Sequence, residues 1–559
     1  MIVFIDGFKR NIYKYVNYVI NIIKIFFSYI ENILILRKSN DFDGGIDFMS
    51  MKSNQTSSKL NVLNTPKIFT ILVDDVVVIK NKIVVNIGQI VLRGQVLALG
   101  YKNIAPMHSP VSGLITQITN EEFKFFSNKR YSIINIQSDG QDRWINRTPI
   151  HNYKNLSVNK IIQFIYNAGI VGLGGAGFLS SKKLKYSIKK VHTLVVNAAE
   201  SEPYVTSDDC LMQNFATEIV QGCQIVMWIL KIKFVLIAIE DDKHLAYIKV
   251  HDAINHLSGF EIRKIKKKYP SGSSKQLIKT LFDQEIPSGK HSIHLGIILF
   301  NVATIFSIKR AILNGEPLTE RIVTLSDKDA LYQKNFLVRI GTPVKHILLE
   351  NNINFKSNSI ILGGPITGFI VDNVNFPILK TSNSVLFLKS SLLKYELEQP
   401  CIRCTMCSRA CPMNLLPEQL YFYSKSRDHD KSKEYSIQEC IECGICEQVC
   451  PSNIPLLTYF RKEKLKINKI ILKENLSTKF KKLFLSRQSR LRSLESINEN
   501  IILSNSILDK KFEENLILDK KIENLITNKS QNIRKVELEA AINRAKQKQK
   551  LNKCLIDRQ

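Results

Sequence analysis

The sequence predicts a multidomain protein in which β and α/β domains precede a small cysteine-rich helical domain and a charged helical tail. The chain has 559 residues, too many for one hydrophobic core, so three or four domains are expected. Short strand-like segments with intervening turn residues dominate residues 68–137, whereas residues 159–240 alternate between helical and strand-like patterns. Eight of the 11 cysteines are confined to residues 401–450.

Residues 1–40 form the first predicted section, an N-terminal extension. Its apolar stretch from Asn11 to Leu36 contains Lys24 and Glu31. A membrane-spanning helix needs about 20 mainly apolar residues, and each central charge is costly. We therefore expect no membrane span here. A functionless extension and an amphipathic helix on a membrane or partner both remain open.

Residues 41–145 are predicted to form a β domain. Its expected strands are Phe69–Val73, Asn81–Val85, Gly94–Ala98 and Ser112–Ile118. The stretches 88–98 and 109–115 resemble biotinyl- and lipoyl-type sandwich domains, in which a hairpin carries a modifiable lysine. Ala105-Pro-Met-His-Ser-Pro110 replaces that lysine here. The resemblance implies a barrel-sandwich hybrid without a swinging arm.

Residues 146–335 are predicted to form an α/β domain with a glycine loop at Val171–Phe178. Gly172-x-Gly174-x-x-Gly177 matches a dinucleotide fingerprint, but a helix rather than a strand precedes it. Glycines let backbone N–H groups approach a phosphate or a flat ring. A variant dinucleotide loop and a structural turn both remain open.

An acidic turn, Asn197-Ala-Ala-Glu-Ser-Glu-Pro-Tyr204, follows the expected strand Leu194–Val196. Two acids one residue apart beside a glycine loop are suited to holding a hydroxylated, ring-bearing cofactor. An acidic surface loop is equally compatible with this segment. Residues 336–392 are again strand-rich, with a tight loop at Gly363–Gly368.

The clustered cysteines form two copies of one spacing, Cys401-x-x-Cys404-x-x-Cys407-x-x-x-Cys411-Pro412 and Cys440-x-x-Cys443-x-x-Cys446-x-x-x-Cys450-Pro451. This spacing is typical of paired [4Fe–4S] clusters, in which the fourth cysteine of each run ligates the other cluster. The expected ligands are Cys401, Cys404, Cys407 and Cys450 for the first cluster and Cys411, Cys440, Cys443 and Cys446 for the second. Disulfides and zinc fit this spacing poorly. Residues 393–465 are thus expected to form a ferredoxin-type domain, with Cys210, Cys223 and Cys554 as buried or incidental thiols.

Charges near the cysteines predict an asymmetry between the clusters. Arg403 and Arg409 lie in the first run, whereas Glu442 and Glu447 lie in the second. Positive charge stabilises a reduced cluster, so the first cluster is predicted to have the higher reduction potential.

The tail, residues 466–559, is predicted to be basic and helical or partly disordered, because it lacks glycine and proline. The formal net charge of +29 is compatible with an anionic partner, but the joint abundance of Lys, Ile and Asn also fits drift toward A/T-rich codons. No base-reading motif is present, so we expect no nucleic-acid partner.

A family resemblance covers roughly residues 43–464. Its motifs are Gly172–Phe178, Asn197–Tyr204, Lys268–Leu277, Gly315–Arg321 and the two cysteine runs. In this order they resemble the RnfC/RsxC family, a component of the Rnf/Rsx-type ion-translocating electron transport complex. The middle of the chain is also similar to the FMN-binding, NADH-oxidising subunit of respiratory complex I. The resemblance implies FMN and NADH at this site and a β-grasp (SLBB-like) domain at 336–392.

The resemblance also implies roles for particular residues. Four glycines line the flavin phosphate, with a lysine as the nearby positive charge: Gly172, Gly174, Gly175, Gly177 and Lys183. Three side chains contact the flavin or nicotinamide nucleotide and an aromatic ring stacks on it: Asn197, Glu200, Glu202 and Tyr204. The sequence departs from the family at Leu179, usually proline, and at Ser201, usually cysteine.

The function expected from the resemblance is that of a peripheral redox subunit on the cytoplasmic side of a bacterial inner membrane. NADH delivers electrons through FMN and two [4Fe–4S] clusters, and ion translocation belongs to integral-membrane partners. Other expected partners are flavoprotein subunits of the complex and ferredoxin or an equivalent. Two alternatives remain: a soluble iron–sulfur relay without a nucleotide site, and the diaphorase subunit of a soluble hydrogenase or dehydrogenase.

Overall fold

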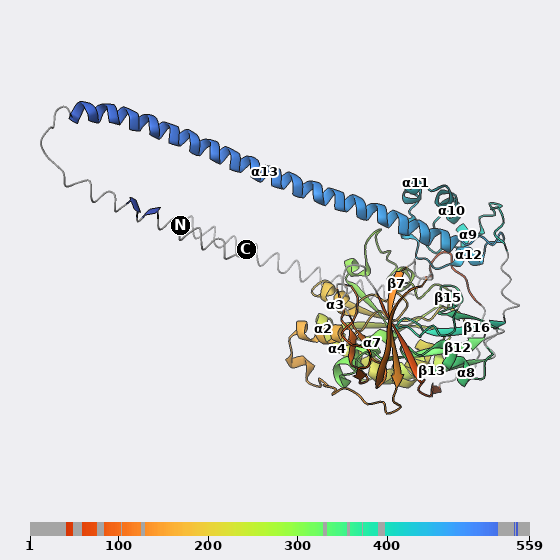
Figure 1. Cartoon of the computed structure of the whole chain (residues 1–559). Coiled ribbons are helices and arrows are strands. Elements are labelled where there is room, and N and C mark those ends of the chain that lie inside the picture. The colour runs from red at the N-terminus through yellow and green to blue at the C-terminus, as the bar shows by residue number, and fades with distance from the viewer. Residues whose placement is uncertain are drawn as a thin grey trace, which may run out of the picture. The chain divides into compact units, whose positions relative to one another are not determined.

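The structure is a computed structural model (Figure 1). It describes residues 41–48, 59–74, 83–101, 103–123, 129–327, 332–354, 358–371, 373–389, 397–523, 541–542 and 544–545. The chain divides into two units, Met1–Lys466 and Ile467–Gln559. The extension expected over residues 1–40 and the thiol of Cys554 lie outside the described residues.

The first domain contains an antiparallel sheet in the order β2-β7-β6-β3 and a two-stranded ribbon, β4-β5. The strands are β2 Ile68–Asp74, β3 Ile90–Val91, β4 Val96–Ala98, β5 Met107–His108, β6 Gly113–Phe123 and β7 Lys129–Ser138. Alternate side chains point inward, and Phe69, Ile71 and Ile134 are fully buried. Three of the four expected strands are confirmed. The described part of the fourth, residues 83–85, pairs through a bridge from Ile83 to Ala98 and forms no strand.

Four parallel strands in the order β10-β9-β8-β11 form the centre of the α/β domain. They are β8 Thr193–Ala198, β9 Phe234–Glu240, β10 Phe260–Ile265 and β11 Ile297–Asn301. The helices are α2 Val158–Asn167, α3 Ser180–Ser187, α4 Ser207–Leu230, α5 His244–Ile254, α6 Ser274–Phe282 and α7 Val302–Lys309. Leu194 packs in one core with α2, α4, α5 and α7, whereas Val195 packs with α6 on the other face. Burial on both faces explains why β8 is apolar at successive positions.

A six-stranded mixed sheet in the order β1-β13-β12-β16-β14-β15 forms the third domain. Its strands are β1 Leu60–Val62, β12 Glu320–Asp327, β13 Gln333–Arg339, β14 Asn358–Leu362, β15 Phe369–Ile370 and β16 Ser384–Lys389. Helix α8, Val344–Glu350, contributes Ile347 and Leu348 to its core. β12 pairs antiparallel with β13 and parallel with β16. The expected domain boundary at residue 335 therefore falls inside a hairpin whose two strands share one sheet.

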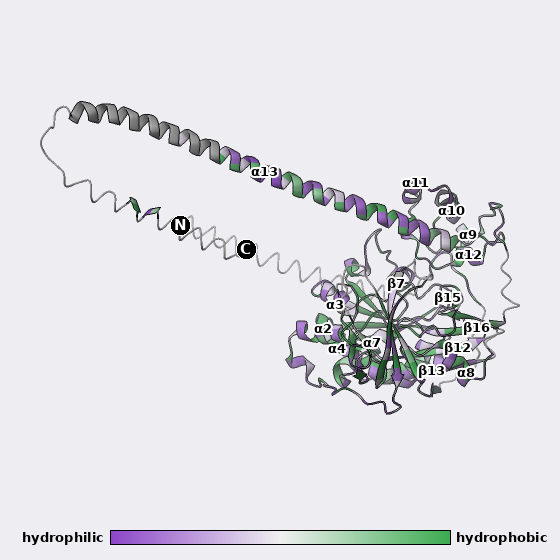
Figure 2. Cartoon of the chain, in the orientation of Figure 1, coloured by the Kyte–Doolittle hydropathy of each residue, from purple (hydrophilic) through white to green (hydrophobic). Residues whose placement is uncertain are grey.

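The cysteine-rich domain is built from short helices: α9 Met406–Ala410, α10 Pro417–Ser426, α11 His429–Glu434 and α12 Ile445–Gln448. Helix α13, Leu456–Glu523, begins here and continues into the second unit. The described part of the expected tail is helical as far as Glu523, leaving aside the few described residues at 541–542 and 544–545. Polar and apolar residues alternate along the coloured part of α13 in Figure 2. Among the described residues, no helix is both long enough and apolar enough to cross a membrane.

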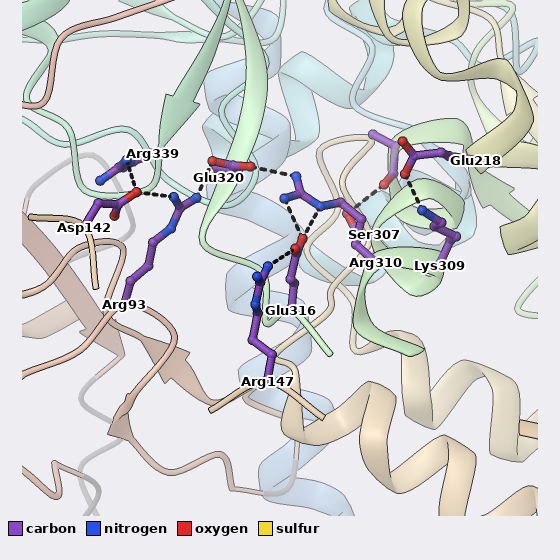
Figure 3. A network of polar contacts seen from close by, with 11 residues as sticks. Arg93, Asp142, Arg147, Glu218, Ser307, Lys309, Arg310, Glu316, Glu320 and Arg339 are labelled. Atoms are coloured by element: carbon purple, nitrogen blue, oxygen red, sulfur yellow. Dashed lines mark hydrogen bonds and ion pairs between the residues drawn. The ribbon is translucent and has the colours of Figure 1, made fainter. Parts of the chain in front are cut away.

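A network of buried and half-buried charges joins the first three domains (Figure 3). Arg93 of the first domain pairs with Asp142 at 2.8 Å and with Glu320 of β12 at 2.5 Å. Glu320 also pairs at 2.7 Å with Arg310, which follows α7. Each charge in this chain of contacts has an opposite charge beside it, which offsets part of the desolvation cost of burial. The network holds the domains that surround the site in a fixed arrangement.

Candidate functional site

A cavity of about 500 Å³ lies at the carboxyl ends of β8 and β11, where parallel sheets commonly bind ligands. The glycine loop, the acidic turn and the start of α6 contribute to its wall. Its volume lies within the range of about 300–1,000 Å³ that is usual for a small-molecule site. The lining residues that the argument uses are Gly172, Gly174, Lys183, Asn197, Glu200, Glu202, Tyr269, Asn301 and Cys443.

The glycine loop is held in a compact turn against α7. Gly172 donates its N–H to the Phe178 carbonyl at 2.8 Å, and the Leu173 N–H donates to Thr304 Oγ1 at 2.9 Å. Gly175 and Gly177 have φ values of +104° and +61°, which residues other than glycine rarely adopt. Neither belongs to the cavity lining. Two of the four predicted glycines therefore line the cavity, and the other two shape the loop.

Lys183 of α3 supplies a cation to the cavity wall. Its Nζ donates to the Leu299 carbonyl and lies 4.8 Å from the centre of the Phe300 ring. Burial lowers its pKa to about 8, because the charged form loses hydration. The ammonium is still mostly protonated at neutral pH. A bound anion would stabilise that charge and raise the pKa again.

The residues of the acidic turn have structural partners. Glu200 Oε1 accepts from Ser207 Oγ at 2.8 Å and from the Asp208 N–H at 3.0 Å, which caps the start of α4. Asn197 Nδ2 donates at 2.8 Å to the carbonyl of Gly272. Glu202 Oε1 accepts from the N–H of Thr367 at 3.1 Å, which ties the turn to the loop of the third domain. These three side chains line the cavity while they brace its wall.

The prediction for Tyr204 has no support in the geometry. Tyr204 lies outside the residues that line the cavity, and its carbonyl accepts from Gln333 Nε2 at 3.0 Å. Its φ of +64° turns the chain from the acidic turn into α4. The aromatic side chain in the wall is instead Tyr269.

Sequence reasoning missed several wall residues. Asn301 Nδ2 donates to Asp208 Oδ2 at 2.7 Å, so the end of β11 is fastened to the start of α4 inside the cavity. Tyr269 and Ser273 come from the segment Lys268–Leu277. That segment contributed to the family resemblance, but no chemistry in its residues distinguished them as wall residues. Asn301 had no sequence signal beyond its place after an apolar strand.

The eight clustered cysteines line two further cavities. Cys401, Cys404, Cys407 and Cys450 line one of them. Cys411, Cys440, Cys443 and Cys446 line the other. These are the two crossed sets predicted from the spacing. No three Cys, His, Asp or Glu side chains converge on a single-ion site within the described residues. Thiols spread around a cavity suit a cubane, which binds one thiolate per iron, better than a zinc ion with four ligands at about 2.3 Å.

Burial makes two of these thiols, Cys407 and Cys443, poor acids on their own. It raises the pKa of Cys443 to about 12, and burial with the neighbouring Glu418 raises that of Cys407 to about 12. Deprotonation therefore requires a cationic partner, which iron supplies when it binds. Cys210 and Cys223 lie buried within α4, as expected for packing thiols.

The charges near the cysteines differ from the sequence prediction. Glu442 in the second run accepts from Lys464 Nζ at 2.7 Å and from Arg461 Nε at 3.2 Å, so its charge is offset locally. Beside the first cavity, Cys407 Sγ lies 3.4 Å from Glu418 Oε2. One of the two acids behind the predicted asymmetry is therefore offset and the first cavity has an acid of its own, while the predicted order of potentials stays untested.

The second cysteine cavity adjoins the large cavity. Cys443 lines both, and its carbonyl accepts from Tyr269 Oη at 2.7 Å. Gln276 Nε2 donates at 2.9 Å to the carbonyl of Pro412, which follows the ligand candidate Cys411. Contacts from the α/β domain thus hold the second cysteine set beside the cavity.

The chain matches three families of domains. Residues 40–141 match the RnfC barrel sandwich hybrid domain, residues 165–310 the Nuo51 FMN-binding domain, and residues 400–454 the 4Fe–4S dicluster domain. The barrel-sandwich, flavin-type and ferredoxin-type parts of the predicted fold are thus confirmed. The class is that of a redox protein with an FMN-binding domain followed by an iron–sulfur dicluster domain.

Relatives define the family more closely. The chain is 49% identical over 507 residues to the C subunit of the ion-translocating oxidoreductase complex of Buchnera aphidicola subsp. Baizongia pistaciae, covering 89% of this chain and 99% of that protein. It is 41% identical to the protein of the same name from Erwinia tasmaniensis, covering 82% of this chain and 58% of that protein. The chain belongs to this family of C subunits, the RnfC/RsxC family.

Among solved structures, the chain is similar to an H2-reduced NAD+-reducing [NiFe]-hydrogenase, with a TM-score of 0.39 and 14% identity. That match covers 58% of this chain and 63% of the other. A likeness at this level bears on neither fold nor function.

Proposed function

We propose that this protein is the peripheral redox subunit of an ion-translocating oxidoreductase complex, in which it oxidises NADH and passes electrons through two [4Fe–4S] clusters. The observation that carries the proposal is the wall shared by two sites: Cys443 lines both the large cavity and the second cysteine cavity. A nucleotide site and a cluster site that share a residue are suited to electron transfer between them.

The large cavity fits a flavin nucleotide. Gly172 and Gly174 leave its wall without a Cβ, so backbone groups of the loop are accessible to a phosphate or ring. Lys183 supplies a cation for the phosphate, and the first residues of α6 line the same cavity, where the positive end of a helix dipole favours an anion. Bound flavin would accept a hydride and release single electrons, which iron–sulfur clusters carry one at a time.

The two cysteine sets would hold the clusters in series. The second set adjoins the large cavity, whereas none of the first set lines it. Cys411 of the first run would ligate the second cluster and Cys450 of the second run the first cluster, so each cluster would be bound by cysteines of both runs. The first cluster would then pass electrons to partner subunits or to a ferredoxin-type carrier.

The remaining assignments concern the third domain and the location. In the strand order β13-β12-β16-β14-β15, the first strand in sequence, β12, and the last, β16, lie side by side and parallel at the centre of the sheet. This arrangement supports a β-grasp domain that begins at β12. We place the protein on the cytoplasmic side of the inner membrane, bound to integral-membrane and flavoprotein subunits. NADH is a cytoplasmic metabolite, which supports this side.

Anaerobic purification followed by iron, sulfide and flavin analysis tests the proposal. About eight irons per chain are expected for two cubanes, and NADH should bleach the FMN-reconstituted protein. Intact clusters without bleaching would support the pure relay instead.

Two matched variants test the crossed ligands. Cys450→Ala should remove the EPR signal of the first cluster and Cys411→Ala that of the second. Cys223→Ala, a buried cysteine outside both cavities, serves as the control. Loss of the opposite signal in each variant would contradict the assignment.

A further inference from the structure

Residues 41–48, here called the N-terminal strap, lie between the second cysteine site and the wall of the large cavity. Gly45 N–H donates to the Ala410 carbonyl at 2.9 Å, next to Cys411. On the other side, Ile46 and Tyr269 exchange two backbone hydrogen bonds of 3.0 and 2.9 Å. The strap therefore contacts both the chain that carries Cys411 and the residue that contacts Cys443.

Gly44 is the point of closest approach. Its φ is +64°, and a Cβ added there would lie 2.6 Å from the Cys411 carbonyl oxygen and 2.8 Å from that of Ala410. These are backbone atoms, which cannot rotate away as the end of a side chain can. Gly45, with a φ of +79°, would bring a Cβ to 2.8 Å from the Tyr269 carbonyl oxygen. Any side chain at either position would push apart the strap and the segments that it touches.

Lys268 fixes the strap from the side of the α/β domain. Its Nζ donates to the Phe42 carbonyl at 2.5 Å and to Asp41 Oδ1 at 3.1 Å, and it lies 4.5 Å from the centre of the Phe42 ring. Phe42 itself is buried. Lys268 and Tyr269 of the α/β domain thus hold the strap at Phe42 and Ile46. Between these two points, its two glycines lie against the segment that carries Cys411.

We propose that Gly44 and Gly45 are positioning residues for the second iron–sulfur cluster. By allowing the strap to lie against the Cys411 backbone, they hold this ligand in place opposite Cys443, whose carbonyl bonds to Tyr269 in the cavity wall. The inference rests on the proposed function, because it takes Cys411 and Cys443 as ligands of that cluster. The strap would thereby set how firmly the second cluster is held and where it lies relative to the flavin cavity.

Gly44→Ala in the full-length, anaerobically purified protein tests this role. Gly140→Ala is the matched control, since Gly140 has a φ of +74° and no atom within 4 Å of an added Cβ. Both variants carry the backbone strain, but only Gly44→Ala carries the clash with Cys411. The readout is the EPR signal of each cluster, assigned with the cysteine variants above, during incubation with an iron chelator. Partners beyond the ligands typically change metal affinity about 10- to 100-fold, so Gly44→Ala should lose the second signal about tenfold faster and keep the first.

A second variant covers the case in which Gly44→Ala does not fold. Lys268→Met removes the anchor without a clash, and Lys190→Met, which removes a lysine lying 3.7 Å from the Tyr186 ring, is its control. Lys268→Met should also speed loss of the second signal alone. Equal decay in each variant and its control, or parallel loss of both signals, would overturn the inference. A wild-type protein without a second cluster would instead contradict the proposed function.

Discussion

His108 should make the docking of the first domain dependent on pH. This residue of β5 is buried, and burial together with the charge of Lys380 lowers its pKa from 6.5 to about 3. Lys380 belongs to the third domain, and its Nζ donates to the carbonyls of Pro106 in the first domain at 2.8 Å and of Gly169 in the α/β domain at 2.7 Å. The histidine therefore stays neutral in the folded protein at pH values where it is protonated in the unfolded chain.

The sign and size of the effect follow from this difference. Between pH 6.5 and 3 the unfolded chain binds the extra proton, so the free energy of unfolding falls as the pH is lowered. At pH 5.5 an unfolded histidine of pKa 6.5 is about nine-tenths protonated, and the linked loss is about 1.4 kcal/mol relative to pH 7.5. His108→Gln keeps a hydrogen-bond donor but does not titrate.

The assay is urea denaturation at pH 5.5 and 7.5, followed through tryptophan fluorescence. One of the two tryptophans, Trp144, lies 4.3 Å from the Arg93 guanidinium at the edge of the first domain and reports its release. The wild type should lose about 1.4 kcal/mol more than His108→Gln on acidification. Equal losses in the two proteins would refute the reasoning, because all other titrating groups are shared.

Three further predictions concern Lys380, Lys183 and Arg93. Burial lowers the pKa of Lys380 to about 7, so between pH 7 and 10.5 the unfolded chain binds more protons than the folded protein. The free energy of unfolding measured in urea should therefore rise in this range by up to about 1.4 kcal/mol per pH unit. Lys380→Met should abolish this contribution to the slope. Lys183→Met should weaken FMN binding about tenfold in a flavin-fluorescence titration, since a partly buried charge pair contributes about 1.4 kcal/mol or more; the neighbouring Lys182→Met, whose Nζ bonds to Asn103 on the surface at 2.7 Å, should not. Arg93→Met should lower the free energy of unfolding by about 1–3 kcal/mol, because Asp142 keeps its ion pair with Arg339 and Glu320 keeps its ion pair with Arg310. Leaving a buried charge without any partner would cost about 3–5 kcal/mol. A loss of more than about 3 kcal/mol in a denaturation curve would contradict the claim that these partners are redundant.

The elements with a strong local signal were predictable. The short apolar segments Phe69–Val73 and Leu194–Val196 identified β2 and β8, because burial of strand faces favours apolar, β-branched residues. Strand β1 and the start of the third domain at β12 were not predictable in the same way. β1 has three residues and pairs with β13, some 270 positions away, so its place depends on a contact that no local pattern records.

The candidate site divides in the same manner. The glycine loop and acidic turn were recognisable as segments, but their individual roles were not. Glu200 caps α4. The aromatic residue in the cavity wall is Tyr269 and not Tyr204, which was predicted to stack there. Which side chain of a turn faces a cavity depends on the backbone path and on the partners that compete for each polar group.

The sequence by itself determined the two crossed cysteine sets, because four thiolates per cubane impose a spacing that few other structures need. Only the tertiary structure decided what surrounds them. Charges close in the sequence suggested a more negative second site, yet Lys464 and Arg461 neutralise Glu442, and Glu418 lies beside Cys407 in the first. Electrostatic energy depends on distance in space rather than along the chain. For the same reason, only the fold places the second site against the large cavity, with Gly44 on its other side.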